Sequence, residues 1–386
     1  MWIWNWFQGL SGEGKALIFA VAGAAAKWWM DRRFIARLRG EIKCKEEELR
    51  RKEDELSKKE HRLDDVEREL NAAKEKIDRL KGALRGSESG IWTTFPRRPP
   101  FADFDARIGR RSPIILTVAN NKGGVGKTTL VGNLLAYFEK KKGLRVLALD
   151  MDYQGSLTTM LQGQQDLVVT GKSDINSLLT KGADLATLLS IVRGLGAKLS
   201  NSGHVSAFYD LALLEDQLMV DWLLQEDDGD DVRYRLANLL LQPQITQRFD
   251  LVLIDVPPRL TTGTMNALCS STHILIPTIF NPIAAEPVPN FLDAASRLLH
   301  ELNPAVKFAG IVETMSPPDT VGQPTRIRGR GMIEAALRRH PGLSILENHV
   351  PRRVPIAEGG VAYLADASAR AIFDKVGDEI STRIGL

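Results

Sequence analysis

The sequence predicts an α/β domain with a mostly parallel sheet, preceded by a long N-terminal coiled-coil helix. Short apolar runs alternate with longer helical stretches, at residues 114–119, 145–149, 250–254, 273–276 and 308–312. Strands rich in Val, Ile and Leu that alternate with helices are typical of parallel sheets covered on both faces. Apolar residues at heptad spacing before this domain predict the coiled coil.

Composition divides the chain into four regions. We expect a Trp-rich hydrophobic segment over residues 1–30, a coiled coil over 31–85, a linker over 86–112 and the α/β domain over 113–386. The two cysteines give no disulfide framework, which fits a reducing cytoplasm. The net charge of +3 comes mainly from the coil, and residues 86–386 are close to neutral. Any affinity for DNA must therefore come from a local patch.

A glycine-rich loop joins the first apolar run of the domain to the following helix. It consists of Lys122, Gly123, Gly124, Val125, Gly126, Lys127, Thr128 and Thr129. Between a strand and a helix, such glycines let backbone N–H groups surround phosphate oxygens, while the second lysine reaches the β- and γ-phosphates. The hydroxyl of Thr128 is then placed to bind Mg²⁺. The loop predicts a site for a nucleoside triphosphate.

Three aspartates are candidates for the chemistry of phosphoryl transfer. Asp255 follows a buried run and is placed to hold Mg²⁺ through water. Asp150 ends the preceding run and is a candidate to support the metal or its waters, and Asp152 is free to orient an attacking water. A helix N-cap or turn is the alternative role for Asp152. The histidines and cysteines show no metal spacing or triad-like cluster, so nothing suggests nucleophilic catalysis.

Lys122 and its neighbours resemble the deviant Walker A box of the ParA/MinD ATPases, with Asn120 and Asn121 before K-G-G-V-G-K-T-T. Residues 150–156, D-M-D-Y-Q-G-S, are similar to the ParA pattern D-x-D-P-Q-G-[SN], with Tyr153 in place of the usual proline. Residues 249–258 resemble the Walker B and switch II box, a hydrophobic strand followed by D-x-P-P. The resemblance covers roughly residues 111–386, and its later I-P-R…E-A segment matches residues 350–354 and Glu358.

This resemblance implies an ATP hydrolase with ATP and Mg²⁺ as cofactors, slow alone and stimulated by a partner protein. It implies a nucleotide-sandwich homodimer in which Lys122 touches the partner's nucleotide; a solvated loop lysine is the alternative. The implied catalytic residues are Lys122, Lys127 and Asp152, and the implied metal residues are Thr128, Asp255 and Asp150. An adenine pocket near residues 351–353 is implied only at the level of the family.

A basic cluster near the C-terminus is a candidate site for non-specific DNA binding, as the resemblance to DNA-holding ParA proteins implies. Its spacing favours phosphate contacts from a loop at a helix start, and a solvated basic face is the alternative. No helix-turn-helix is evident. The candidate residues are Arg326, Arg328, Arg330, Arg338 and Arg339.

The coiled-coil region carries an apolar residue at every seventh position, and its companion column contains three successive lysines. We expect it to raise the assembly to a homodimer or higher homo-oligomer; a solitary, charge-stabilised spacer helix is the alternative. The apolar column is Ile35, Ile42, Leu49, Leu56, Leu63, Leu70, Ile77 and Leu84, and the lysines are Lys45, Lys52 and Lys59.

The segment 1–30 has two open interpretations. Tryptophans flank an uncharged run over residues 16–26, which resembles interfacial anchoring in a membrane but is short of the ~20 residues of a spanning helix. Burial in an assembly or partner interface is the alternative. We expect the helical pattern of this segment to be interrupted at residues 11–14. We expect the linker to lack regular structure and its aromatic residues to pack partly on the domain.

Two uses of such an ATPase follow from these regions. In the first, ATP-dependent dimerisation controls binding to DNA or cargo, as in partition and positioning. In the second, the chain is an oligomeric scaffold or sensor that recruits a membrane or effector partner, for example in phage defence. Both predict a cytoplasmic protein, with the N-terminus as the candidate for membrane association.

Overall fold

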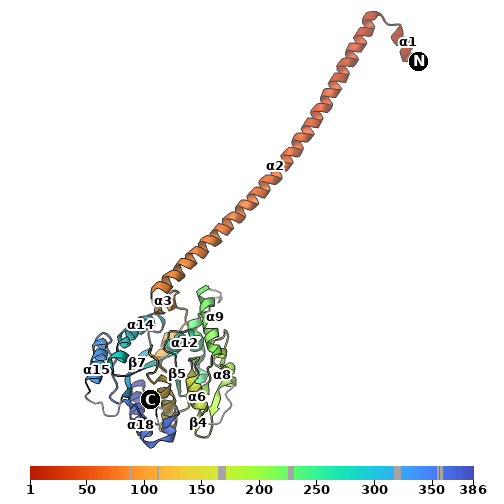
Figure 1. Ribbon diagram of the computed structural model, residues 1–386. Coiled ribbons are helices and arrows are strands. Elements are labelled where there is room, and N and C mark those ends of the chain that lie inside the picture. Colours follow the sequence, from red (N-terminus) through yellow and green to blue (C-terminus); the bar gives the residue numbers. More distant parts are fainter. Residues whose placement is uncertain are drawn as a thin grey trace. The chain divides into compact units, whose positions relative to one another are not determined.

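The computed structural model describes residues 1–86, 88–110, 113–163, 171–224, 230–316, 323–353, 356 and 360–386. The chain forms two compact units, Met1–Asp78 and Arg79–Leu386. Figure 1 shows the elements of each unit. Among the described residues, no helix is both long and apolar enough to cross a membrane.

The first unit is helical. Helix α1 spans Trp2–Gln8 and helix α2 spans Gly12–Gly86, so α2 continues past the end of the unit. The expected break at residues 11–14 is wrong: the turn lies at residues 9–11, and Gly12 and Gly14 are already helical. The ring of Phe7 meets that of Phe19 edge-on at 5.5 Å between centroids, which places α1 against the first turns of α2.

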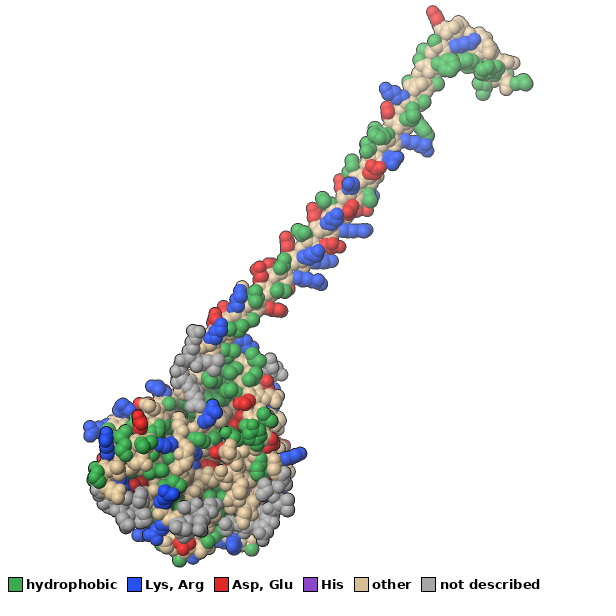
Figure 2. Space-filling view, viewed as in Figure 1, with side chains coloured by type: hydrophobic (Ala, Val, Ile, Leu, Met, Phe, Trp, Pro, Cys, Tyr) green, Lys and Arg blue, Asp and Glu red, His purple; other side chains and the backbone are tan. Residues whose placement is uncertain are grey.

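The heptad column forms an uncovered apolar stripe along α2. Figure 2 shows hydrophobic side chains spaced along this helix among lysines, arginines and acidic residues. In the described part of the single chain, these side chains stay about half exposed. Seven members are between 46% and 60% exposed: Ile35, Ile42, Leu49, Leu56, Leu63, Leu70 and Ile77.

The second unit is built on an eight-stranded sheet, ordered β3-β4-β2-β5-β1-β6-β7-β8. All neighbours are parallel except β3 and β4, which confirms the predicted fold class. The strands β3, β4 and β8 were not predicted, because they are short or rich in polar residues. The strands are β1 (Ile114–Val118), β2 (Val146–Asp150), β3 (Arg193–Leu195), β4 (Leu199–Val205), β5 (Leu251–Asp255), β6 (His273–Thr278), β7 (Lys307–Ser316) and β8 (Val350–Pro351).

Helices cover both faces of the sheet and enclose two separate cores. Successive strand residues alternate between these cores: Ile115 belongs to one and Leu116 to the other, as the pleat requires. The core containing Leu116 is closed by α5 (Lys127–Lys140), α6 (Ser156–Gln162), α17 (Ala362–Ala365) and α18 (Ala367–Ile384). The core containing Ile115 is closed by α7 (Asn176–Leu179), α8 (Leu185–Ile191), α9 (Asp210–Leu224), η1 (Val232–Tyr234), α10 (Arg235–Leu240), α11 (Pro243–Thr246), α12 (Thr262–Ser270), α13 (Pro282–Ala285), α14 (Pro287–Leu302) and α15 (Pro324–Leu337).

The segment expected to be an irregular linker contains two short helices, α3 (Glu88–Trp92) and α4 (Phe104–Arg110). The expectation of no regular structure is therefore wrong, because tertiary packing outweighs the poor helix propensity of Gly, Ser and Pro. Trp92, Phe104 and Ile108 are each 1% exposed and belong to the larger core. The indole of Trp92 stacks on that of Trp222 at 5.4 Å between centroids. This segment is part of the domain core.

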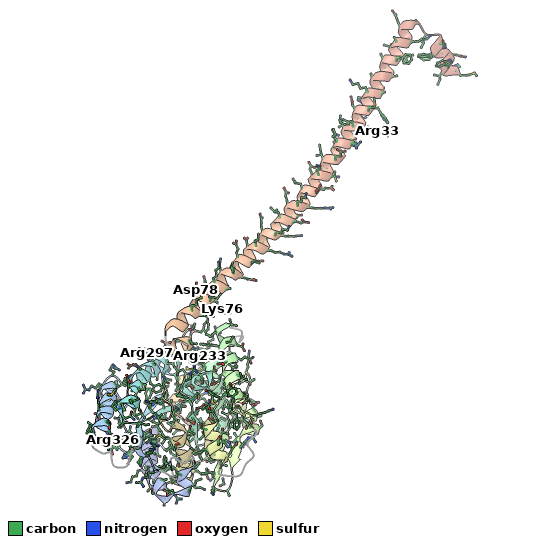
Figure 3. All side chains as sticks on the ribbon, in the orientation of Figure 1. Arg33, Lys76, Asp78, Arg233, Arg297 and Arg326 are labelled. Carbon is green, nitrogen blue, oxygen red and sulfur yellow. The ribbon has the colours of Figure 1, made fainter. Side chains whose placement is uncertain are left out.

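A buried arginine fastens this segment to the domain. The guanidinium of Arg233, labelled in Figure 3, is fully buried and paired with Asp231 at 2.6 Å. It donates to the carbonyl oxygens of Trp92 (2.5 Å), Phe95 (3.2 Å) and Pro96 (3.0 Å). Asp231 also accepts the backbone N–H of Arg98 at 3.0 Å. The guanidinium charge is thus balanced by a carboxylate, and its N–H groups donate to backbone carbonyl oxygens, as a buried ion requires.

We predict that Arg233→Met destabilises the domain by about 3–5 kcal/mol, because Asp231 would stay buried without its partner. Arg97→Met is the control. Arg97 pairs with Asp105 at 2.7 Å with both side chains partly exposed, so its loss should cost at most about 1 kcal/mol. Urea unfolding followed by tryptophan fluorescence measures both variants. Equal losses would show that the buried pair does not fasten the segment.

Candidate nucleotide site

The site residues meet at the carboxyl ends of three neighbouring strands. Asp255, the last residue of β5, lies in register with Asp150 at the end of β2 and with Val118 at the end of β1. The glycine-rich loop follows β1 directly. Parallel strands that end at one edge bring residues far apart in sequence together there, which is where ligands bind in such sheets.

The loop that follows β1 has the backbone of a phosphate site. Gly124 and Gly126 have φ angles of 71° and 79°, in the left-handed region that favours glycine. Helix α5 begins at Lys127, and its N-cap, Gly126, offers no side chain to the first-turn N–H groups. Those N–H groups and the positive end of the helix dipole are suited to hold an anion.

Lys127 is folded onto the loop. Its ammonium donates to the carbonyl oxygens of Asn120 at 3.3 Å and Lys122 at 3.2 Å, and its side chain is buried. Burial lowers the pKa of Lys127, and the nearby charges of Asp255 and Asp152 oppose that shift. A phosphate group that replaced the two carbonyls would give this cation a charged partner.

Asp255 has the features of a ligand to a cation. Its Oδ2 accepts the hydroxyl of Thr128 at 2.6 Å, while its buried Oδ1 has no hydrogen-bond partner among the described residues. Burial, and after it the neighbouring Asp150, raise the pKa of Asp255 well above its usual range. An unpartnered buried carboxylate oxygen beside a threonine hydroxyl fits Mg²⁺, which prefers oxygen ligands.

Asp150 uses its oxygens within the protein. It accepts the backbone N–H and the hydroxyl of Thr158, both at 2.8 Å, and the N–H of Asp152 at 3.1 Å. Burial raises the pKa of Asp150 to about 7, although these hydrogen bonds lower it. The carboxylate therefore ties the start of α6 and the backbone of Asp152 to the end of β2.

The two remaining predicted catalytic residues lie at the rim of the site. Asp152 is half-buried, and its Oδ1 accepts the N–H of Gln154 at 3.0 Å, a turn contact that leaves its second oxygen available. The ammonium of Lys122 donates to the carbonyl oxygen of Ile283 in the same chain at 2.7 Å. The side chain of Ile283 is 77% exposed, so this lysine lies at an open apolar surface.

A pocket opens beside the phosphate loop. Gly126, Thr129 and Leu130 form one wall, and residues 314–315, 350–353 and 356 form the other. Met315 has a φ of 54°, a strained conformation for a residue with a side chain, and it lines this pocket. The residues 351–353 named for an adenine pocket thus lie against the loop, whereas Glu358 is outside the described residues.

Several residues that shape the site carry no strong sequence signal. The buried Asn120 accepts the N–H of Lys122 at 3.0 Å and donates to the carbonyl of Pro277 at 2.7 Å, which fixes the loop's entry. Thr314, on β7, donates to the carbonyl of Val125 at 2.7 Å. Only Asn120 stands next to the glycine motif. Thr158 and Thr314 lie at the site because of the order of the strands in the sheet, which cannot be predicted from a local sequence pattern.

Three residues of the basic cluster, Arg326, Arg328 and Arg330, lie on a helix instead of the expected loop, because α15 already begins at Pro324. The other two, Arg338 and Arg339, lie in the turn that follows the end of α15 at Leu337. Arg326, labelled in Figure 3, forms a short ion pair with Glu313 on β7. Arg330 pairs with Glu334 at 2.8 Å and Arg339 with Asp293 at 2.9 Å. Within the described part of the chain, only Arg328 and Arg338 of the five candidates lack an acidic partner, which leaves a much smaller cationic patch.

Comparison with known proteins identifies the family. Residues 114–308 match the AAA_31 family, an AAA domain. The chromosome-partitioning ATPase Soj of Thermus thermophilus is 30% identical over 275 residues, which is 70% of this chain and 96% of that protein. The chain belongs to the ParA/MinD family of P-loop ATPases. The chromosome partitioning protein ParA of Myxococcus xanthus is also 30% identical, over 66% of this chain and 79% of the relative.

Solved structures of relatives agree with this membership. Cobyrinic acid a,c-diamide synthase from Mycobacterium smegmatis, with bound ATP analog and magnesium, is 27% identical, with a TM-score of 0.50 over 68% of this chain and 96% of that one. An ATP complex of Cyanothece McdA has a TM-score of 0.57 at 19% identity, over 71% of this chain and 96% of that one, and supports the fold alone. This ParA/MinD-type ATPase is therefore similar to a protein whose structure holds an ATP analog and magnesium.

We predict that Asp255→Asn lowers ATP turnover by at least about 100-fold, because a carboxylate oxygen suited to Mg²⁺ is lost. It should also flatten the pH dependence of stability without nucleotide. Burial raises the folded pKa of Asp255 well above 3.8, as it raises that of Asp150 to about 7, so the folded chain holds protons that the unfolded chain releases. This contribution to stability is present below pH ~4 and is lost as the pH rises through the raised pKa values.

Phosphate release and urea unfolding at pH 5 and pH 8 measure both effects of Asp255→Asn. The control is Asp250→Asn, just before the opposite end of β5, where the carboxylate pairs with Arg145 at 2.7 Å. It should keep turnover within about twofold, since it lies far from the reacting phosphates. Wild-type phosphate release by Asp255→Asn would contradict the assignment of Asp255 as a metal ligand.

Proposed function

We propose that this ATPase is a nucleotide-controlled switch, which works as a coil-linked homodimer and controls binding to DNA or cargo. The observation that carries the proposal is the arrangement of Lys127, Thr128 and Asp255 at the start of α5, where a buried cation, a hydroxyl and an unpartnered carboxylate oxygen converge. The names of the relatives, a chromosome-partitioning ATPase and ParA, support the partition or positioning role.

In this proposal the backbone N–H groups of residues 123–129 bind the phosphates, and Lys127 exchanges its two carbonyl contacts for phosphate oxygens. Thr128 and Asp255 hold Mg²⁺, which supplies neutralisation of the phosphate charge. Asp152 orients the attacking water, while Asp150 fixes the backbone of Asp152 through its 3.1 Å hydrogen bond.

Dimer closure involves the face that carries Lys122. Its ammonium donates to a backbone carbonyl, that of the exposed Ile283, and a partner's phosphate binds a cation more strongly than a neutral carbonyl does. ATP would therefore draw Lys122 towards the second copy, as the family resemblance implies. Hydrolysis would remove that attraction and reopen the dimer.

The stripe on α2 supports a second, permanent contact between copies. Its companion column holds Lys45, Lys52 and Lys59, and each lysine is followed directly by a glutamate. In a parallel, in-register coiled coil, a residue of this column packs beside the residue that directly follows the same heptad position on the partner helix. Each lysine would then meet a glutamate of the second copy. The contact at 3.0 Å between Lys52 and Glu48 within one helix is exposed and contributes little.

We predict that Leu56→Glu halves the mass of the nucleotide-free protein. Leu56 is 60% exposed in the single chain and would be covered in the coil, where a buried unpaired carboxylate costs several kcal/mol. His61→Glu, on the opposite side of the same helix, adds the same charge and should leave the mass unchanged. Light scattering over a concentration series measures both. A monomeric wild type would contradict the coil.

The proposed binding to DNA depends on Arg328 and Arg338, the two arginines of the basic cluster that have no acidic partner within the described residues. We predict that Arg328→Ala/Arg338→Ala weakens ATP-dependent binding to duplex DNA and reduces the slope of log K against log salt by about 1–2. Arg248→Ala is the control, because that exposed arginine lies near the amino end of β5, away from α15. Fluorescence anisotropy with ATP and with ADP measures binding. Wild-type protein that binds no DNA in either state would rule out this part of the proposal.

One observation favours the scaffold or effector role instead. Trp2, Trp4 and Trp6 in α1 are 83%, 64% and 57% exposed, a cluster of large apolar side chains of a kind that usually marks an interaction site. A partition ATPase has no need of this cluster. Absence of DNA binding, together with retention of the coil, would make a membrane or effector partner at α1 the preferred function.

A further inference from the structure

A single hydrogen bond joins the segment that follows the coil helix to the segment that follows Asp255. The indole N–H of Trp92 donates to the carbonyl oxygen of Leu260 at 2.9 Å. Trp92 ends α3, which begins two residues after α2 ends at Gly86. Leu260 lies five residues beyond Asp255. One buried tryptophan therefore links the end of the coil helix to the chain beyond the metal-binding carboxylate.

Trp92 is held firmly from the domain side. Its side chain is 1% exposed, its ring stacks on Trp222, and its carbonyl oxygen accepts Arg233 at 2.5 Å. An aromatic side chain with this burial sits in one rotamer, because neighbouring atoms fill the space around it. Its N–H group thus has a fixed position with respect to Leu260.

The segment that receives this bond, residues 256–261, has other hydrogen bonds close to Leu260. Pro257 and Pro258 have no backbone N–H to donate. The carbonyl of Arg259 accepts the Thr264 hydroxyl at 2.7 Å, and the N–H of Gly263 donates to Glu215 at 2.7 Å. Leu260 is therefore one of the points that fix residues 256–261 in space.

This segment also borders the nucleotide loop. A Cβ atom built on Gly123 would meet Cγ of Pro258 at 4.0 Å, which is ordinary van der Waals contact. It also forms part of the wall of a groove, which is lined by Trp92, Leu260 and Tyr153 among others. Tyr153 adjoins Asp152. A displacement of Leu260 would thus move backbone next to the phosphate loop, and it would change the groove wall beside Tyr153, the neighbour of Asp152.

We propose that Trp92 is a positioning residue that couples association of the coil to ATP hydrolysis. In this proposal, pairing of two α2 helices restrains the chain that leads into α3, and Trp92 passes that restraint to Leu260 and hence to the residues after Asp255. The inference rests on the proposed coil-linked dimer. It deepens that function by making the coil a regulator of turnover as well as a tether.

The test is a double-mutant cycle in the full-length protein, with Leu56→Glu, Trp92→Phe and the combined variant. Trp92→Phe keeps an aromatic ring and removes the N–H donor. Each protein is measured for mass without nucleotide, for KM and for kcat at saturating ATP. We expect Leu56→Glu to lower kcat at least about threefold when Trp92 is present and less than about 1.5-fold in the Trp92→Phe background, with KM unchanged.

Trp222→Phe is the matched control. Trp222 shares the aromatic stack and is buried, but among the described contacts it makes no hydrogen bond to residues 256–261. In its background, Leu56→Glu should lower kcat as much as in the wild type. The same loss of coupling in both tryptophan variants would assign the effect to packing and overturn the role of the N–H group.

The two proposals fail in different ways. If Leu56→Glu keeps the wild-type mass, the coil does not join two copies through this stripe, and both the dimer and the coupling are wrong. If Leu56→Glu halves the mass but lowers kcat equally with and without the Trp92 indole, the coil-linked dimer stands and the coupling through Trp92 is wrong.

Discussion

The burial of two carboxylates at one edge of the sheet is the constraint on which the nucleotide site depends. Asp150 and Asp255 end adjacent parallel strands in register, so the fold places two acids side by side in a region closed to water. Burial raises the pKa of both, so their ionised forms are held at a cost in stability. Asp150 offsets this cost with three hydrogen bonds, whereas Asp255 has one and an unpartnered oxygen among the described contacts. A divalent cation would relieve what remains, which links metal and nucleotide binding to the stability of the core.

Compensation of buried charge also holds the segment that precedes β1. Arg233 and Asp231 are almost fully buried, and their hydrogen bonds hold the backbone of residues 92–98. A segment rich in Pro, Arg and Gly thereby becomes part of the larger core instead of a free tether. This segment follows α2 in the chain and reaches the backbone beyond Asp255 through one indole N–H, which is the contact on which the proposed coupling depends. A loose linker would isolate the coil from the site.

Ion pairing also decides which surfaces remain available to partners. Three of the five arginines in the basic cluster are paired with acids of the same domain: the pair of Arg326 is largely buried, whereas those of Arg330 and Arg339 are exposed and weak. The stripe on α2 is the opposite case, since its side chains stay half exposed in the single chain. Burial of apolar surface favours association between copies and needs no oppositely charged partner. The larger uncovered surface of this chain is therefore the apolar stripe on α2, and the basic cluster keeps only Arg328 and Arg338 without an acidic partner among the described residues.

The sequence by itself determined the parallel sheet, the phosphate loop and the long helix, because each depends on local patterns: apolar runs of strand length, glycines before G-K-T, and a seven-residue repeat. It also placed Asp150 and Asp255 at strand ends. Tertiary structure alone decided that these acids are neighbours, that Thr314 and Thr158 brace the site, and that residues 88–110 are core. It decided as well that Arg326 and Arg339 are paired. Strand order and long-range ion pairs join residues that are distant in the chain, and no local pattern records them.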